Sequence, residues 1–188
     1  MILGGDKANA DPRNLAQPLQ NVVCKGEINT ETYNFHDTMG LGGQTRDADS
    51  ARATRSLYRL VGELSNAGGI NLLVYVVKCN KQSAKTLRKN YSLMYHGLCD
   101  SGVPIVMVVT GCENVKPTAE NWWIENEPAL TRVGMSFDGH ACVCAKKGGD
   151  GGYDEAVRQL IFQHSLSEGW KQVRNSNSQS LRVQNRIH

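Results

Sequence analysis

Two uninterrupted apolar runs dominate the hydrophobic pattern of the chain, INLLVYVV at residues 70–77 and VPIVMVV at residues 103–109. Neither run alternates with polar residues, which is typical of parallel strands that helices cover on both faces. A shorter strand is predicted at residues 140–144. Because helical patterns lie between these runs, the sequence predicts an α/β fold with a largely parallel sheet in three layers.

Helical periodicity fills the segments around these strands. One helix is predicted to begin near Asp49 or Ser50 and to end at Asn66, where the chain continues with Ala-Gly-Gly. Its inward positions keep the i, i+3, i+4, i+7 spacing of one helix face: Leu57, Leu60, Val61 and Leu64. Further helices are predicted over three segments: residues 82–99, 120–133 (broken near Pro128) and 153–168.

A pair of strands is predicted before the first long helix, at residues 21–25 and 32–37, with a turn over residues 26–30 between them. A glycine-rich loop follows at residues 40–43. The sequence therefore predicts a strand pair that leads into a glycine-rich loop.

Charge is spread unevenly along the 188 residues, whose net charge is +3. Residues 171–188 hold four basic residues and no Asp or Glu, which leaves the rest of the chain close to neutral. We therefore predict a body over residues 1–170 and a basic, polar tail over residues 171–188. The near-neutral body gives no support for nucleic-acid binding, and no nucleic acid is expected as a partner.

The apolar runs are far shorter than the roughly 20 residues of a membrane-spanning helix, and no secretory signal pattern opens the chain. Six cysteines are present and none forms a C-x-x-C pair. We interpret them as reduced, mostly buried thiols of a cytoplasmic protein. An alternative zinc site at His140, Cys142 and Cys144 lacks a second pair of ligands.

Candidate chemistry begins where the second predicted strand ends, at Asp37-Thr-Met-Gly40. A carboxylate at the carboxyl end of a strand lies where open α/β folds bind ligands. Asp37 there can hold a Mg²⁺-bound water, and Gly40 lets a backbone N–H approach a phosphate. The alternative is an ordinary turn between a strand and a loop.

Two later strands end in a similar way. Glu113 lies a few residues past the run that ends at Val109, and its carboxylate can accept two N–H bonds from guanine, which adenine cannot supply. After residues 140–144, the backbone N–H of Ala145 can reach an acceptor such as the guanine O6. The alternatives are a turn or capping acid at Glu113 and a plain turn beside a solvated Lys146.

Taken together, these motifs resemble a known family. The segments DTMGLGG, INLLVYVVKCNK, NYSLMYHGLC, VPIVMVVTGCEN, WWIENE and GMSFDGHACV are similar to fungal G-domain-containing proteins, relatives of Ras-type and immunity-associated GTPases. The resemblance covers roughly residues 1–165 and includes the paired Trp122 and Trp123. It implies a Ras-like G domain, which belongs to the P-loop NTPase-like folds, and GTP and GDP as ligands.

By this resemblance, residues 37–40 stand as the DxxG motif. The guanine-specificity motif is represented by Thr110, Gly111 and Glu113, with Glu113 in the place of the usual Asp. The last guanine motif is represented by Cys144, Ala145 and Lys146.

The phosphate loop of the family is missing, because no G-x-x-x-x-G-K-[ST] sequence occurs anywhere in the chain. We therefore expect a G domain without its first strand and phosphate loop. Either the strand that ends at Asp37 pairs directly with residues 70–77, or another segment, from the tail or from a partner chain, fills the gap.

Residues 38–49 offer substitutes for the missing loop. Thr38, Gly40, Gly42 and Gly43 are the candidate phosphate-binding residues. Catalysis is assigned to Gln44, Thr45 and Arg46: Arg46 is the basic residue nearest to DxxG, and Leu41 stands where Ras-type proteins carry their water-positioning Gln. A Mg²⁺ site is predicted at Asp37, Asp47 and Asp49, although the last two are also suited to helix capping.

The sequence therefore predicts a guanine-nucleotide-binding protein that hydrolyses GTP slowly with Mg²⁺. The competing hypothesis is a catalytically inactive pseudo-GTPase that serves as a protein-interaction module. A second copy of the chain or another G-domain protein is the expected protein partner.

Overall fold

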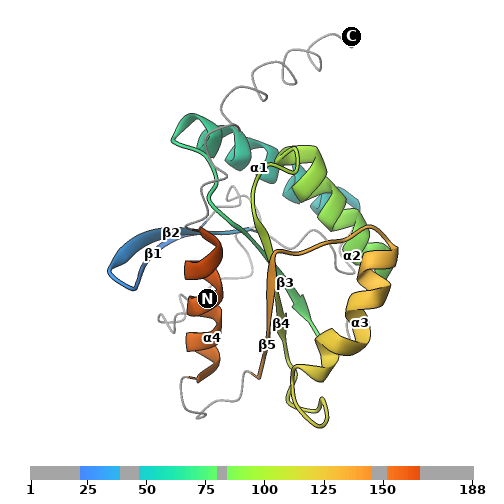
Figure 1. Cartoon of the computed structure of the whole chain (residues 1–188). Helices are drawn as coiled ribbons and strands as arrows, with labels where there is room; N and C mark the ends of the chain where they lie inside the picture. Colours follow the sequence, from blue (N-terminus) through green and yellow to red (C-terminus); the bar gives the residue numbers. More distant parts are fainter. Residues whose placement is uncertain (1–21, 39–46, 80–83, 145–151, 166–188) are drawn as a thin grey trace, which may run out of the picture. The chain divides into compact units, whose positions relative to one another are not determined.

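The computed structural model describes residues 22–38, 47–79, 84–144 and 152–165 (Figure 1). They divide into two compact units, Met1–Leu60 and Val61–His188. The first unit holds a β-hairpin and most of the long helix α1 (Asp47–Asn66), and the second holds the parallel sheet with its helices. Each unit is described by itself below.

The hairpin of the first unit consists of β1 (Val22–Ile28) and β2 (Glu31–Asp37), which pair antiparallel. Its turn has two residues, Asn29 with φ 48° and Thr30 with φ 69°. Two consecutive left-handed residues match the twist of the strands and give the tightest hairpin connection. The predicted turn over residues 26–30 is therefore too long, and Gly26 lies within β1.

Helix α1 confirms the predicted helix and most of its inward face, since Leu57, Leu60 and Val61 are buried and Leu64 is half-buried. Ala53, which was not predicted, is buried as well. The helix ends at Asn66, and Gly68 and Gly69 follow with φ of 125° and 97°. The N–H of Gly69 donates to the carbonyl of Leu64 at 2.8 Å. Glycine tolerates these backbone angles, so the helix stops where the sequence predicts.

The second unit contains a parallel sheet of β3 (Leu73–Lys78), β4 (Ile105–Thr110) and β5 (Gly139–Val143) in that order. The register aligns Val76 with Val108 and Val108 with Ala141. All three strands lie within or next to the apolar runs that predict them. The parallel sheet of the sequence analysis is confirmed for this part of the chain.

Helices cover both faces of this sheet (Figure 1). On one side lies α4 (Gly152–Ser165), and on the other lie α2 (Ala84–Tyr91), the π-helix η1 (Ser92–Leu98) and α3 (Asn121–Arg132). The larger core, against α2 and α3, includes Met107, Val109, Tyr91 and Met135. The smaller core packs Leu160 of α4 against β4 and β5. The unit is thus a three-layer α/β arrangement.

Strand β3 departs from the prediction that both of its faces are buried. Val77 is buried and Tyr75 is half-buried, but the side chains of Val74 and Val76 are 37% and 58% exposed. The reason is that α4 packs on β4 and β5 and leaves the same face of β3 uncovered. Among the three described strands of this sheet, the central strand β4 is the one buried on both faces.

Two predicted helices also differ in detail. The helix predicted over residues 82–99 forms as α2 and continues directly as η1. The break near Pro128 is wrong, because α3 runs through it. Pro128 has no N–H and so cannot donate a hydrogen bond to the carbonyl of Ile124. Both residues are exposed, Ile124 at 62%. Water can therefore satisfy that carbonyl.

In the described residues β2 is hydrogen-bonded to β1, and β3 is hydrogen-bonded to β4. Strands β2 and β3 belong to different units, and each has a second edge. Both expected arrangements for the gap, direct pairing of β2 with residues 70–77 and a segment that fills the space, therefore stay predictions. None of the helices in the described ranges has the length and apolar character needed to cross a membrane.

Candidate functional site

The carboxyl ends of the three parallel strands lie side by side and carry the second and third sequence motifs. The N–H of Cys79, just after β3, donates to the carbonyl of Thr110 at 2.8 Å. The N–H of Cys112 donates to the carbonyl of Val143 at 3.3 Å. These bonds continue the sheet past its ends, so the segments after β4 and β5 meet at one edge, as predicted from sequence.

Gly111 is the tightest point of this edge. Its φ of 78° is left-handed, and a β-carbon placed on it would lie 3.3 Å from Cε of Lys78 and 3.9 Å from Oε2 of Glu113. Both charged side chains therefore border the same glycine, and Glu113 is half-buried. A side chain at position 111 would strain the backbone and crowd both groups.

Lys78 was missed by the sequence analysis. It is the last residue of β3 and is exposed. A basic residue directly after an apolar run, at the ligand-binding edge of a parallel sheet, was a signal that pointed to it. Lys78 supplies a cation beside the segment that carries Gly111 and Glu113, which are predicted to bind guanine.

The other residues predicted for guanine binding are placed in part. The hydroxyl of Thr110 donates to the carbonyl of Val77 at 3.2 Å, so it helps to join β3 and β4. Cys144 follows β5 directly and is half-buried. Ala145 and Lys146 lie outside the described residues.

Residues predicted for the phosphate and metal side belong to the first unit. Asp37 ends β2, and both Asp37 and Thr38 are exposed. Asp47 and Asp49 lie in the first turn of α1, and the structure gives no description of their side chains. Six more candidates lie outside the described residues: Gly40, Gly42, Gly43, Gln44, Thr45 and Arg46.

Buried thiols lie below the same edge. Burial, together with the neighbouring thiols of Cys142, Cys79 and Cys144, raises the pKa of Cys112 to about 12. Burial together with the charge of Glu120 raises the pKa of Cys142 to about 11. At neutral pH these thiols are protonated, and a protonated thiol is a poor nucleophile and a poor metal ligand. Their role is packing.

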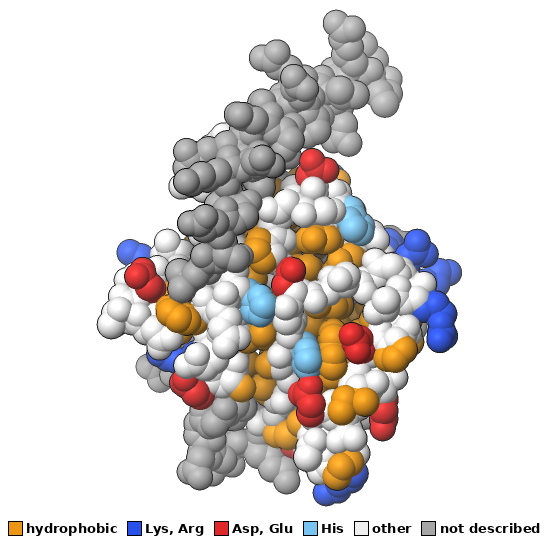
Figure 2. All heavy atoms as spheres, viewed as in Figure 1, with side chains coloured by type: hydrophobic (Ala, Val, Ile, Leu, Met, Phe, Trp, Pro, Cys, Tyr) orange, Lys and Arg blue, Asp and Glu red, His pale blue; other side chains and the backbone are white. Residues whose placement is uncertain are grey.

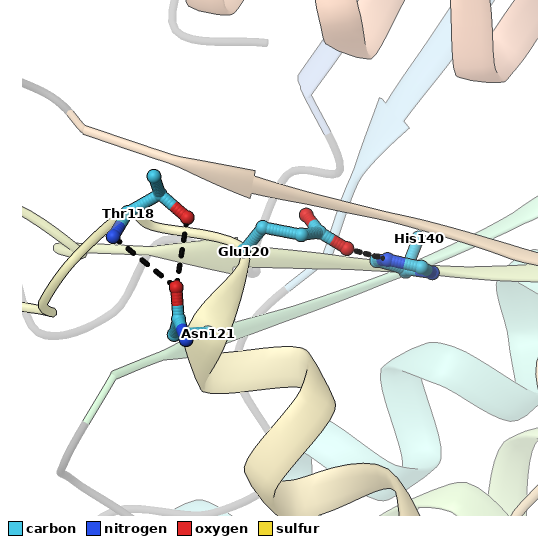
Figure 3. A network of polar contacts seen from close by, with 4 residues as sticks. All are labelled: Thr118, Glu120, Asn121 and His140. Carbon is cyan, nitrogen blue, oxygen red and sulfur yellow. Dashed lines mark hydrogen bonds and ion pairs between the residues drawn. The ribbon is translucent and has the colours of Figure 1, made fainter.

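A second polar cluster, which sequence reasoning did not find, joins α3 to β5 (Figure 3). His140 of β5 forms a hydrogen-bonded ion pair with Glu120 and stacks on Trp123, with ring centroids 4.1 Å apart and ring planes within 8°. Beside it, the side-chain oxygen of Asn121 accepts bonds from the N–H and the hydroxyl of Thr118. The cluster fixes the start of α3 against the sheet.

The zinc alternative has no support in the described residues. His140 is engaged with Glu120 and Trp123, and no three side chains of His, Cys, Asp or Glu gather there as a set of metal ligands. On the face seen in Figure 2, histidine and acidic side chains are interspersed with hydrophobic ones around β5, and the basic side chains lie toward the margins.

No family model matches the chain, and neither a curated protein nor a solved structure matches it. The chemistry of the site therefore follows from its own residues. What these residues provide is a half-buried carboxylate, a left-handed glycine, a nearby lysine and two strand ends that meet. Such an edge can accept the polar face of a flat, hydrogen-bond-donating ligand.

Proposed function

We propose that the chain binds a guanine nucleotide with Mg²⁺ and hydrolyses GTP slowly, and that its fold is a Ras-like G domain without the first strand and phosphate loop. The observation that supports this best is the meeting of the two guanine motifs at the carboxyl edge of β4 and β5. The N–H of Cys112 bonds the carbonyl of Val143, so Glu113 and Cys144 follow strand ends that are joined.

Base selection follows from the chemistry of Glu113. Its carboxylate accepts the guanine N1–H and the exocyclic amine, while the backbone after Cys144 donates to O6. Adenine has no N1–H and would place a lone pair against the half-buried anion. Each unsatisfied group costs about 1–3 kcal/mol, so guanine is preferred by roughly tenfold to several thousandfold.

The phosphates would be held without the usual loop. The backbone N–H groups of the glycines between 40 and 43 and the hydroxyl of Thr38 would serve as donors, and Asp37 with Asp47 and Asp49 would hold Mg²⁺. In hydrolysis, water attacks the γ-phosphorus and GDP leaves. Gln44 and Thr45 orient that water, and Arg46 neutralises the charge that develops in the transition state.

The experiment that tests binding is a calorimetric titration of the full chain with GTP, GDP and ATP, each in the presence of Mg²⁺. The proposal expects GTP and GDP to bind and ATP to bind at least about tenfold more weakly. If none of the three binds, the proposal is wrong.

A second candidate function is a catalytically inactive pseudo-GTPase that acts as a protein-interaction module. The observation that favours it is the exposed apolar pair Val74 and Val76 on β3. Release of phosphate from GTP by the wild-type chain, lost in Asp37→Ala, would reject this second function. GTP binding without any phosphate release would favour it.

A further inference from the structure

The outer edge of β3 is open in the part of the chain that the structure describes. The sheet has the order β3-β4-β5, so β3 has a described neighbour on one side only. An open edge presents a row of unpaired backbone donors and acceptors and is a template for another strand. Natural edges are usually protected by charges, prolines or bulges, whereas β3 has no proline and a single charge, at its last residue Lys78.

The backbone groups that point out of this edge can be identified. The N–H of Leu73 donates to the carbonyl of Pro104 at 2.9 Å, and that of Cys79 donates to Thr110 at 2.8 Å. Odd-numbered residues of β3 therefore direct their backbone groups toward β4. Because these directions alternate along a strand, Val74 and Val76 direct theirs to the open edge.

Val74 and Val76 also carry the exposed hydrophobic side chains of the strand, at 37% and 58% exposed. Their face of the sheet is the one that α4 covers over β4 and β5 but leaves open over β3. Two β-branched side chains and the free backbone groups of the same residues thus lie together. A strand that pairs with this edge would hydrogen-bond to the backbone groups and pack against the side chains.

We propose that β3 pairs with β3 of a second copy of this chain, antiparallel, about a two-fold axis at Tyr75. This register places Val74 opposite Val76 of the partner, and Val76 opposite Val74 of the partner. Both members of each pair direct their N–H and C=O to the edge, so they exchange two hydrogen bonds per pair.

Self-complementarity is what favours a second copy over another occupant. A two-fold axis perpendicular to the sheet keeps the α4 faces of both copies on the same side, so four exposed valines become one continuous patch. The uncharged run sets no like charges against each other. Lys78, at the end of the strand, comes opposite Leu72 of the partner and away from the Lys78 of the partner.

Sedimentation of the full chain over a range of concentrations, without nucleotide, tests the proposal. The wild-type chain is expected to dimerise reversibly, and Val76→Lys to raise the dimer dissociation constant at least about tenfold, because the charge enters the paired face. The matched control is Ile124→Lys, an equally exposed apolar residue on α3, which should leave the dimer intact.

A monomeric wild-type chain at every concentration would overturn the proposal, and so would equal disruption by the control.

Mixed disulfide formation tests the register. Chains with Val74→Cys, mixed with chains with Val76→Cys, should give more cross-linked dimer under mild oxidation than either variant alone. Equal cross-linking in the mixture and in the separate variants would overturn the register at Tyr75. Neither variant changes Glu113. Failure of the dimer proposal would therefore not bear on nucleotide binding, which the calorimetric titration tests separately.

Discussion

The indole of Trp123 lies flat on the imidazole of His140 and so fastens the first turn of α3 to β5. His140 contributes twice, because it also pairs with Glu120. A stacked aromatic pair contributes about 0.5–1.5 kcal/mol beyond its buried area, whereas a solvent-exposed ion pair contributes less than about 1 kcal/mol. Stacking is therefore the larger of the two contributions.

We expect His140→Ala to lower the free energy of unfolding by about 1–2 kcal/mol in urea denaturation. His140→Phe keeps the stacking on Trp123 and loses the ion pair with Glu120. Its free energy of unfolding should therefore fall by less than half as much as that of His140→Ala. Equal losses in the two variants would show that the ion pair with Glu120 dominates. Gln159→Ala, which removes an exposed bond to Glu155 within α4, serves as the control.

The carboxylate of Glu113 is expected to determine nucleotide affinity. Glu113→Gln presents an amide donor to the guanine N1–H and should weaken GTP binding by more than about tenfold. The residue follows a strand in a loop and contributes little to the core, so the thermal midpoint should stay close to that of the wild-type chain. Unchanged affinity in calorimetry would place the guanine pocket elsewhere.

The buried face of β4 is expected to be the most sensitive part of the second unit. Met107 is 0% exposed in the larger core, and Met107→Ala should cost about 2–5 kcal/mol through lost burial and a cavity. Ile124→Ala, at a site 62% exposed, should change stability by less than about 0.5 kcal/mol. Chemical denaturation of both variants measures these two changes in the free energy of unfolding. The slope of that free energy against denaturant concentration should stay the same in both.

Stability should fall at alkaline pH because of the buried thiols. Burial raises the pKa of Cys99 to about 11, of Cys112 to about 12 and of Cys142 to about 11, from a usual value of 9.0. Below pH 9 both the folded and the unfolded chain keep these protons, so the contribution to stability is complete. Above pH 9 the unfolded chain loses them first, and stability declines as pH rises toward 11–12.

Urea denaturation at pH 7, 9 and 10.5 measures this decline. Cys112→Ser removes one of the titrating groups and should make the decline with pH shallower. Val109→Ala removes buried volume from the same core without removing a titrating group, so it should lower stability equally at all three pH values. Parallel pH profiles for the wild-type chain and Cys112→Ser would contradict the prediction.

Gly139 has no room for a side chain. A β-carbon there would lie 2.5 Å from Nε2 of His164 and 2.8 Å from Cδ1 of Leu160, so Gly139→Ala should cost about 1–3 kcal/mol. Addition of His164→Ala should recover part of that loss. Gly62→Ala is the control, because nothing lies within 4 Å of its β-carbon and alanine favours the helix by up to about 1 kcal/mol. Thermal unfolding compares the three variants.

The sequence was sufficient to predict the second unit because its signals are local and strong. Continuous apolar runs such as residues 103–109 correspond to buried strands, and the Gly68–Gly69 pair marks a helix end that only glycine tolerates easily. Pattern alone could not show that β3 has one uncovered face, because burial depends on which strands α4 reaches. Val74 and Val76 look the same in sequence as Val106 and Val108.

The candidate site was predictable to a similar extent. Parallel strands bring their carboxyl ends to one edge, so Thr110, Gly111 and Cys144 could be grouped from sequence. Lys78 was missed because it belongs to none of the three sequence motifs. The pairing of Glu120 with His140 was missed because it joins residues twenty positions apart through α3 and β5, and no short spacing indicates it.

The parallel register also constrains the order in which this unit can assemble. Leu73 aligns with Ile105, and Val106 aligns with Gly139, so each pairing must close a segment of about 30 residues that contains its own helices. During synthesis β3 emerges about 30 residues before β4, its hydrogen-bonded neighbour in the described residues, so its apolar side chains lack that neighbour in the interval. Chaperone demand should therefore be concentrated in the interval between synthesis of β3 and synthesis of β4.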